Sequence, residues 1–282
     1  QCYGCLMGNV HLNSQFTRHP FIERLQDNFQ QSKHLICVGL DPDLARLPSY
    51  YDASVEGVYS FLMDVVESSL DYCLCYKPNI SFFEALGIDG LRMLQKLVQQ
   101  IPQTHPVIID AKRGDIGNTS NMQARYIFDV LGADATTLHP YMGDDSLTPF
   151  FEYRDKYHFV LGLTSNEGAA MFEKLSLLKS ELLYERVIKQ CVNWNRQYGN
   201  VGVVVGATQT ELASIRSIDS ELLFLIPGVG TQGGSYEMVF QDGVNTAQLA
   251  LINISRGLLY GSDDKITSLL LSERLKYFTS SV

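Results

Sequence analysis

One stretch decides the fold of this chain: residues 107–119, which read VIIDAKRGDIGNT. A short apolar run ends at Asp110, and four charges then fall within six residues, at Asp110, Lys112, Arg113 and Asp115. A buried charge is costly unless it is paired, so the pattern indicates either a site or an ordinary ion pair at a strand end. In a strand, Asp110 and Lys112 point to the same side because side chains alternate. A lysine held between carboxylates stays protonated and in place, as an acid must if it gives a proton to a carbanion.

The length and composition are those of a protein with a large core. The chain has 282 residues, of which 45% are hydrophobic and 19% charged, and this suits a single α/β barrel. A net charge of −9 argues against broad binding to nucleic acid or anionic membranes, although a few local cations suffice for a small anionic substrate. No apolar run approaches the roughly 20 residues that span a membrane. We therefore expect neither nucleic-acid nor membrane partners.

The six cysteines are sparse, and we interpret them as buried thiols of a protein from a reducing compartment, the cytoplasm. Cys2 and Cys5 have the spacing of half a redox or zinc site, but no second pair follows them. No Ser-, Gly- or Pro-rich linker divides the chain. We therefore expect residues 1–20 to form a poorly ordered N-terminal extension and residues 21–282 to form one barrel domain.

Strand-like and helix-like patterns alternate along the chain about eight times. The predicted strands are short, apolar and bounded by Gly, Pro, Asp or His, as parallel strands buried on both faces should be. They are Leu35–Gly39, Cys73–Lys77, Val107–Asp110, Ala135–Leu138, Phe159–Leu163, Gly202–Val205, Leu223–Ile226 and Ala250–Ile254. The predicted helices are Pro20–Gln30, Val55–Leu70, Gly90–Gln99, Glu181–Gln197, Thr208–Ile218 and Lys265–Phe278, and Thr208 with Glu211 has the spacing of a capping box. Repeated βα units of this length favour a closed (β/α)8 TIM barrel, an α/β fold.

Polar residues follow nearly every predicted strand. In a barrel the carboxyl ends of the strands form the active face, so these residues should gather around one mouth. In chain order they are Asp41, Lys77, Asn79, Asp110, Lys112, Asp115, His139, Tyr141, Thr164, Ser165, Asn166, Ala207, Thr208, Gly228–Gly234, Ser255, Arg256 and Gly257. Lys77 could bridge to Asp110 from the neighbouring strand. His139 has no partner at metal-ligand spacing, and we interpret it as structural.

Two segments near the C-terminus have the composition of phosphate-binding loops. Ser255-Arg256-Gly257 follows the eighth predicted strand, where barrels often bind phosphate, and the alternative is a turn with a solvent-facing arginine. Residues 227–234 read PGVGTQGG and contain the pattern G-x-G-x-x-G. A dinucleotide fingerprint belongs to an early βα unit with an acidic residue about 20 positions on, and neither condition is met. A phosphate-gripping loop with Gln232 reaching the ligand fits better.

Taken together, these motifs resemble those of the orotidine 5′-phosphate decarboxylase family, in the form that occurs in the branch found in some bacteria and parasitic protozoa. The resemblance extends from about Phe21 to Phe278. Its most specific part is DAKRGDIGNT from Asp110 to Thr119, and the other motifs occur in the family's order: Gly39-Leu40-Asp41-Pro42, Lys77-Pro78-Asn79, Phe82-Phe83-Glu84, residues 227–233 and Ser255-Arg256-Gly257.

The resemblance implies a carbon–carbon lyase that needs no cofactor and no metal and that makes uridine 5′-monophosphate (UMP) in pyrimidine biosynthesis. The implied catalytic tetrad is Lys77, Asp110, Lys112 and Asp115. Lys112 would protonate C6 of the pyrimidine as carbon dioxide leaves, and Asp110 would lie near the substrate carboxylate. Lys77 and Asp115 would hold the array rigid.

The resemblance also implies how the nucleotide is held. Asp41 would bind a ribose hydroxyl, and Thr164 or Ser165 would meet the pyrimidine. The implied substrate-binding residues are Asp41, Asn79, Ile116, Thr119, Thr164, Ser165, Pro227, Gln232, Arg256 and Gly257. Of the charged loop, Asp115, Ile116 and Thr119 would reach into a partner's site, so the family's pattern predicts a homodimer.

Two other functions are open to a chain of this kind. One is a metal-dependent sugar-phosphate decarboxylase or aldolase of the same barrel superfamily, but the continuation Arg113-Gly114-Asp115-Ile116 argues against it. The other is a barrel that binds a nucleotide without turning it over. The intact set of Lys77, Asp110, Lys112 and Asp115 argues against lost catalysis.

Overall fold

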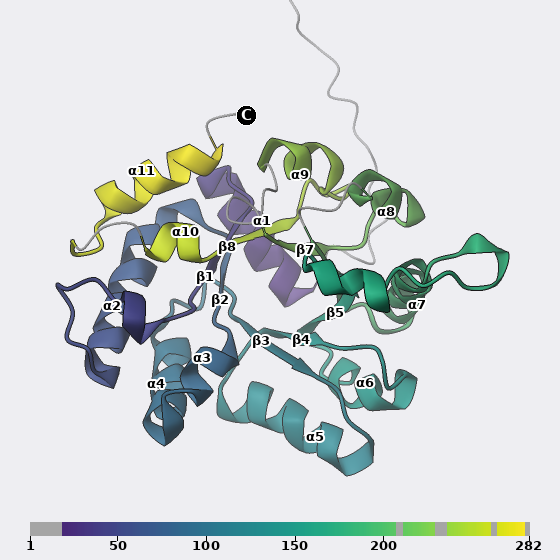
Figure 1. Ribbon diagram of the computed structural model, residues 1–282, viewed down its shortest axis with the longest axis horizontal. Helices are drawn as coiled ribbons and strands as arrows, with labels where there is room; N and C mark the ends of the chain where they lie inside the picture. Colours follow the sequence, from purple (N-terminus) through teal and green to yellow (C-terminus); the bar gives the residue numbers. More distant parts are fainter. Residues whose placement is uncertain (1–18, 207–210, 229–235, 261–263, 280–282) are drawn as a thin grey trace, which may run out of the picture.

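Eight parallel strands form one closed barrel in the part of the chain that the computed structural model describes, residues 19–206, 211–228, 236–260 and 264–279 (Figure 1). They are β1 (Ile36–Gly39), β2 (Cys75–Lys77), β3 (Ile108–Arg113), β4 (Ala135–Leu138), β5 (Tyr157–Leu163), β6 (Val201–Val205), β7 (Phe224–Pro227) and β8 (Leu251–Ile254). The strand order is β2-β1-β8-β7-β6-β5-β4-β3. The two end strands meet, because Tyr76 N donates to Pro106 O and Asp110 N donates to Pro78 O, each at 3.0 Å. The predicted TIM barrel is confirmed.

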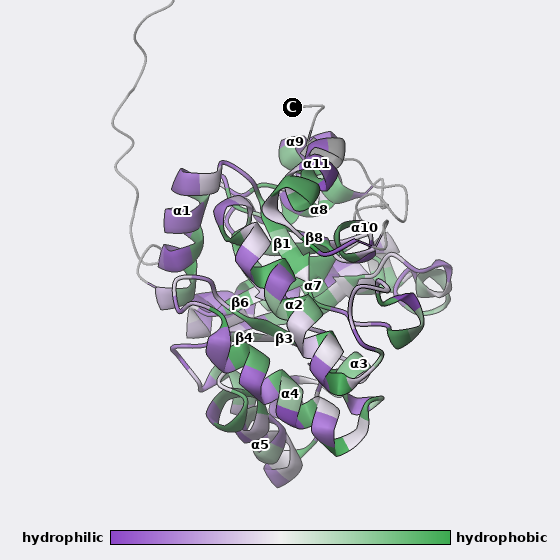
Figure 2. Ribbon diagram, turned by 90° about the vertical axis from the view of Figure 1, so that its left-hand side faces the viewer, coloured by the Kyte–Doolittle hydropathy of each residue, from purple (hydrophilic) through white to green (hydrophobic). Residues whose placement is uncertain are grey.

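Helices surround the barrel, and their residue patterns explain which face turns inward. Figure 2 shows hydrophobic residues concentrated in the central strands and a mixture of both kinds along helices such as α1 and α4. The helices are α1 (Pro20–Ser32), α2 (Val55–Ser69), α3 (Ile80–Glu84), α4 (Gly87–Gln100), α5 (Gly117–Arg125), α6 (Asp144–Phe151), α7 (Leu183–Tyr198), α8 (Leu212–Ile218), α9 (Tyr236–Asp242), α10 (Arg256–Leu259) and α11 (Ser268–Thr279). In α2, Ser54 caps the first turn by accepting from Gly57 N at 3.1 Å, and the stripe containing Phe61 and Val65 is fully buried. None of the described helices is long and apolar enough to cross a membrane.

The N-terminal helix closes one end of the barrel. Phe21 of α1 stacks on Tyr157, the first residue of β5, with ring centroids 5.1 Å apart. Asn28 of the same helix is buried and donates to Leu74 O and Thr104 O, which precede β2 and β3. Because these contacts fill the amino ends of the strands, the opposite mouth is where a ligand can enter.

The predicted strands match the observed ones to within about two residues, apart from the end of the third. Strand β3 continues past Asp110 to Arg113, because a bulge lets it pair with β4 again at Arg113 and Leu138. Helix α1 begins at Pro20, as predicted. Five short helices, α3, α5, α6, α9 and α10, were not predicted.

The start predicted for the helix over residues 208–218 is wrong. Helix α8 begins at Leu212, so Glu211 directly precedes the helix. The prediction had placed Glu211 inside its first turn. The carboxylate of Glu211 accepts from Lys174 Nζ at 2.7 Å. Thr208, the other half of the predicted capping box, lies outside the described residues.

The predicted state of the cysteines is confirmed where it can be seen. Cys37, Cys73, Cys75 and Cys191 are buried free thiols. Burial raises the pKa of the Cys73 thiol to about 12, so this side chain behaves as a small apolar group. Cys2 and Cys5 lie outside the described residues, as does most of the predicted extension.

Candidate active site

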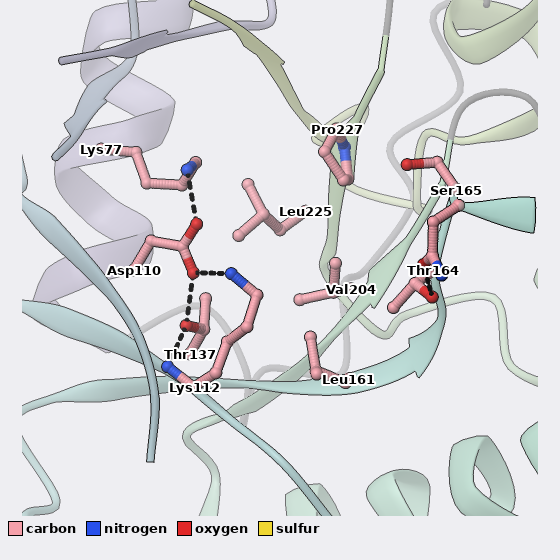
Figure 3. A pocket seen from close by; sticks show the side chains of 11 residues that line it. Lys77, Asp110, Lys112, Thr137, Leu161, Thr164, Ser165, Val204, Leu225 and Pro227 are labelled. Atoms are coloured by element: carbon pink, nitrogen blue, oxygen red, sulfur yellow. Dashed lines mark hydrogen bonds and ion pairs between the residues drawn. The ribbon is translucent and has the colours of Figure 1, made fainter. Parts of the chain in front are cut away.

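A cavity of about 240 Å³ opens at the carboxyl ends of the strands. In Figure 3 the charged side chains lie on one side of it and Thr164 and Ser165 on the other, with apolar side chains such as Leu225 and Val204 between. The lining residues are Lys77, Asp110, Lys112, Thr137, Leu161, Thr164, Ser165, Asn166, Val204, Leu225 and Pro227. This mouth is the one that the positions of the predicted site residues indicated.

Asp110 is the centre of the charged side. Its Oδ1 accepts from Lys112 Nζ at 2.6 Å and from Thr137 Oγ1 at 2.8 Å. Its Oδ2 accepts from Lys77 Nζ at 3.0 Å and from Asn79 Nδ2 at 3.3 Å. A carboxylate has about four acceptor positions, so this one is fully used and cannot rotate without losing a bond.

The electrostatics of the pair Lys77 and Asp110 keep both groups charged. Burial alone would raise the pKa of Asp110, but the nearby ammonium groups of Lys77 and Lys112 outweigh it and hold this pKa well below its usual range. Burial alone would lower the pKa of Lys77, but attraction to Asp110, and then to Asp41, raises it above its usual value. The cavity therefore has a fixed negative charge between two fixed positive ones.

The charged array continues toward the first strand through Asn79. Asn79 caps α3 by accepting from Ser81 N at 3.0 Å, and its own backbone N–H donates to Asp41 Oδ1 at 3.2 Å. The predicted residues Asp41, Asn79 and Asp110 therefore lie in one hydrogen-bonded row. Asp41 lies two residues after the end of β1, and the hydrogen bond from Asn79 N to its Oδ1 holds the side chain at the rim of the barrel mouth.

The two candidates for a pyrimidine contact are differently engaged. Thr164 N and Oγ1 donate to the carboxylate of Glu173 at 2.7 and 2.8 Å. The hydroxyl of Ser165 points toward Pro227 across the cavity in Figure 3. Apolar Leu161 and Val204 lie between this wall and the charged side. Ser165 is therefore the better placed of the two to meet a ligand.

The predicted phosphate-binding residues are only partly brought to the cavity. Pro227 lines it, but Arg256 is exposed and Gly257 half-buried at the start of α10, and neither forms part of the lining. Ser255, which directly precedes Arg256, is adjacent to β1, since a Cβ added at Gly39 would lie 2.5 Å from Ser255 Cβ. Gln232 lies outside the described residues.

The second half of the charged motif does not line the cavity. Asp115 is partly exposed, and its Oδ1 accepts from the next backbone N–H, that of Ile116, at 2.7 Å. The side chain of Ile116 is 59% exposed, and Thr119 is exposed on the first turn of α5. A single chain therefore brings together three of the four predicted catalytic residues, and Asp115 is not among the residues that line the cavity.

Sequence reasoning missed Thr137. This residue lies in β4, is 1% exposed, and hydrogen-bonds to Asp110. The signal in the sequence was the pair of adjacent threonines, Thr136 and Thr137. In a four-residue buried strand, their two hydroxyl groups need hydrogen-bond partners. His139, which we interpreted as structural, hydrogen-bonds through Nε2 to Gly114 O at 3.0 Å. Within the described ranges, no group of three or more His, Cys, Asp or Glu side chains is arranged to hold a metal ion.

Comparison with known proteins identifies the family. Residues 34–269 match the model of the orotidine 5′-phosphate decarboxylase / HUMPS family. An orotidine 5′-phosphate decarboxylase of Christiangramia forsetii is 44% identical over 245 residues, which cover 86% of this chain and 89% of that protein. The structure of Leishmania donovani OMP decarboxylase is 35% identical with a TM-score of 0.80 and covers 92% of this chain and 98% of that one. The Leishmania donovani UMP synthase structure is 37% identical with a TM-score of 0.82, but the match covers only 56% of that chain. Because the family model spans most of the sequence and the relative covers most of both proteins, this chain belongs to the orotidine 5′-phosphate decarboxylase / HUMPS family.

Proposed function

We propose that this protein decarboxylates orotidine 5′-monophosphate to UMP and carbon dioxide, the last step of pyrimidine synthesis. One observation carries the proposal: a buried carboxylate, Asp110, is held between Lys77 and Lys112 at the wall of a cavity at the barrel mouth. The names of the relatives agree with it. The reaction needs an acid, a fixed electric field and a grip on the nucleotide, and residues of this chain can supply each.

Lys112 is the proposed acid. When the bond between C6 and the carboxylate breaks, carbon dioxide leaves and the electron pair stays on C6. The Lys112 ammonium then transfers one proton to C6, which leaves a neutral amine. The side chain of Lys112 is 49% exposed, so water can return the proton after the product leaves.

Asp110 and Lys77 supply the field. Asp110 stays ionised because its pKa is held low, and its fixed charge repels a substrate carboxylate placed beside it. Loss of carbon dioxide removes that repulsion. Lys77, fixed on the other oxygen of Asp110, keeps the array from reorganising while charge develops at C6.

The remaining predicted residues would hold the nucleotide. Ser165 faces the cavity and would contact the pyrimidine, and Asp41 at the rim would take a ribose hydroxyl. Pro227, Gln232, Arg256 and Gly257 would surround the phosphate, which the guanidinium can bind through two parallel hydrogen bonds. Binding energy from the distant phosphate can then be used at the ring.

We also propose that two copies of the chain form a homodimer with shared sites. Asp115, Ile116 and Thr119 are partly or fully exposed and do not line the cavity of their own chain, so they could serve the cavity of a partner. Further exposed apolar side chains lie on α5 and on a neighbouring loop: Met122, Tyr141 and Met142. The buried free thiols fit a cytoplasmic enzyme.

The test is the absorbance change of orotidine 5′-monophosphate on mixing with the purified protein in the presence of EDTA. We expect turnover that EDTA leaves unchanged. Turnover that EDTA abolishes would favour the metal-dependent alternative. Tight binding of UMP without any turnover would favour a barrel that only binds nucleotide.

A further inference from the structure

Strand β3 departs from regular geometry at the catalytic residues. Its pairing with β4 runs from Ile109 opposite Thr136 to Arg113 opposite Leu138. The chain therefore advances four residues along β3 but only two along β4. The residues between leave the ladder, and Lys112 has a φ of +46°, in the left-handed region that a side chain disfavours. Such a conformation is strained and persists only where its surroundings hold it.

The hydroxyl of Thr137 replaces the backbone hydrogen bonds that β3 and β4 do not form at the bulge. Thr137 Oγ1 accepts from Ala111 N at 3.1 Å and from Lys112 N at 3.0 Å. Its own hydrogen is donated to Asp110 Oδ1 at 2.8 Å. A hydroxyl has two acceptor positions and one hydrogen, so all of them are used, and the two N–H donors fix the direction of the O–H bond. Figure 3 shows the bonds from Asp110 through Thr137 to the backbone of Lys112.

The backbone and the side chain of Lys112, the proposed acid, are therefore both held by hydrogen bonds to the pair Thr137 and Asp110. The backbone N–H of Lys112 is held by Thr137 Oγ1, and its side-chain ammonium is held by Asp110 Oδ1, the oxygen that Thr137 also contacts. The Thr137 side chain is buried, so water cannot easily replace it.

We propose that Thr137 is a positioning residue of this enzyme: its hydroxyl sets the bulge of β3 and thereby the place of the Lys112 ammonium relative to Asp110. The inference rests on the proposed decarboxylation. Thr137 needs no contact with the phosphate or the ribose to act in this way. Its loss should therefore slow the chemical step and leave nucleotide binding nearly unchanged.

The neighbouring threonine offers a matched control. Thr136 is equally buried in the same strand, and its hydroxyl donates to Ile109 O at 2.8 Å, before the bulge begins. Thr136→Val and Thr137→Val each exchange a hydroxyl for a methyl group in β4. They differ in whether the lost hydrogen bonds involve Asp110 and Lys112.

The experiment compares kcat and KM of the parent with those of Thr137→Val, Thr137→Ser and Thr136→Val, with thermal melting to check the fold. Thr137→Val should lower kcat by about 10-fold to 100-fold, the effect of losing a hydrogen bond to a charged group, with KM within about 3-fold. Thr137→Ser should restore kcat to within about 3-fold of the parent, and Thr136→Val should leave kcat unchanged. If Thr137→Val is unfolded at the assay temperature, Thr137→Ala should show the same division between kcat and KM.

Two results would overturn the inference. One is an equal loss of kcat in Thr136→Val and Thr137→Val, which would mean a general effect on the strand. The other is a raised KM with kcat retained in Thr137→Val. An inactive parent would instead contradict the proposed function, so the two failures are distinguishable.

Discussion

Lys112 Nζ lies 2.6 Å from Asp110 Oδ1, although the side chain of Lys112 is 49% exposed and that of Asp110 only 10%. A half-exposed lysine is thus tied to a buried anion. The buried partner gives the ammonium a fixed place, and the exposure gives it access to a ligand and to water. This combination is what a proton donor at C6 requires.

Replacing the anion should affect both chemistry and stability. In Asp110→Asn, Lys77 remains buried without its counter-charge, which should cost about 3 kcal/mol of the free energy of unfolding. Turnover should fall at least about 100-fold because the field at C6 is lost. Urea unfolding and steady-state kinetics measure the two effects. Asp89→Asn is the control, since Asp89 pairs with Arg92 at the exposed surface and should change neither quantity.

The arginine at the start of α10 should act on the phosphate alone. Arg256→Ala should raise KM for orotidine 5′-monophosphate by about 10-fold or more, because a charge-assisted contact is lost. It should weaken the binding of UMP by the same factor. Binding of uridine, which has no phosphate, should not change. Titrations of both ligands against parent and variant measure this, and an equal loss for both would mean that Arg256 acts on the fold.

A shared active site predicts that two inactive variants can restore each other. Lys112→Ala removes the proposed acid from its own site, whereas Asp115→Ala would remove a residue from the partner's site. After the two variants are unfolded and refolded together, one site of each mixed dimer contains neither change. About a quarter of the parent activity should then return. No recovery, with dimers present by sedimentation, would mean that Asp115 serves its own chain.

Acid should destabilise the protein through a histidine that lies far from the cavity. His158 of β5 is fully buried against Phe128 and Phe151, with ring centroids 5.5 and 5.6 Å away, and burial lowers its pKa to about 3. The unfolded chain binds a proton at this residue below its ordinary pKa of about 6.5. Stability should therefore fall as the pH drops below that value, by up to about 1.4 kcal/mol per pH unit from this group.

His158→Phe should make that dependence shallower. Urea unfolding between pH 4.5 and pH 7.5 measures it, and the difference at pH 7.5, where the imidazole is neutral in both states, corrects for altered packing. Asp110 acts in the same direction but at lower pH: its folded pKa is held low, so its contribution is lost as the pH falls through and below the ordinary pKa range of an aspartate. Parallel curves for parent and variant would contradict the assignment.

The barrel and most of its mouth could be predicted because they follow from strong local signals. Apolar runs such as Gly202–Val205 favour buried strands, and polar residues directly after parallel strands meet at one edge. The bond from Lys77 to Asp110 follows from the neighbouring strands. The two threonines of β4 indicated buried hydroxyl groups, but the bulge at Lys112 that Thr137 contacts could not be predicted, because a bulge depends on the register of two strands distant in sequence. The start of α8 was misplaced because it was predicted from a local spacing alone, whereas the helix begins at Leu212.

The most direct test is the turnover of Lys112→Ala beside Lys189→Ala. The two lysines are matched: Lys189 is 52% exposed and binds Glu181 at 2.8 Å on the outer surface, as Lys112 at 49% binds Asp110 at 2.6 Å in the cavity. Lys112→Ala should lose at least about 1,000-fold in kcat while keeping its melting temperature and its binding of UMP, and Lys189→Ala should match the parent. Turnover of Lys112→Ala within about 10-fold of the parent would contradict the assignment of Lys112 as the acid.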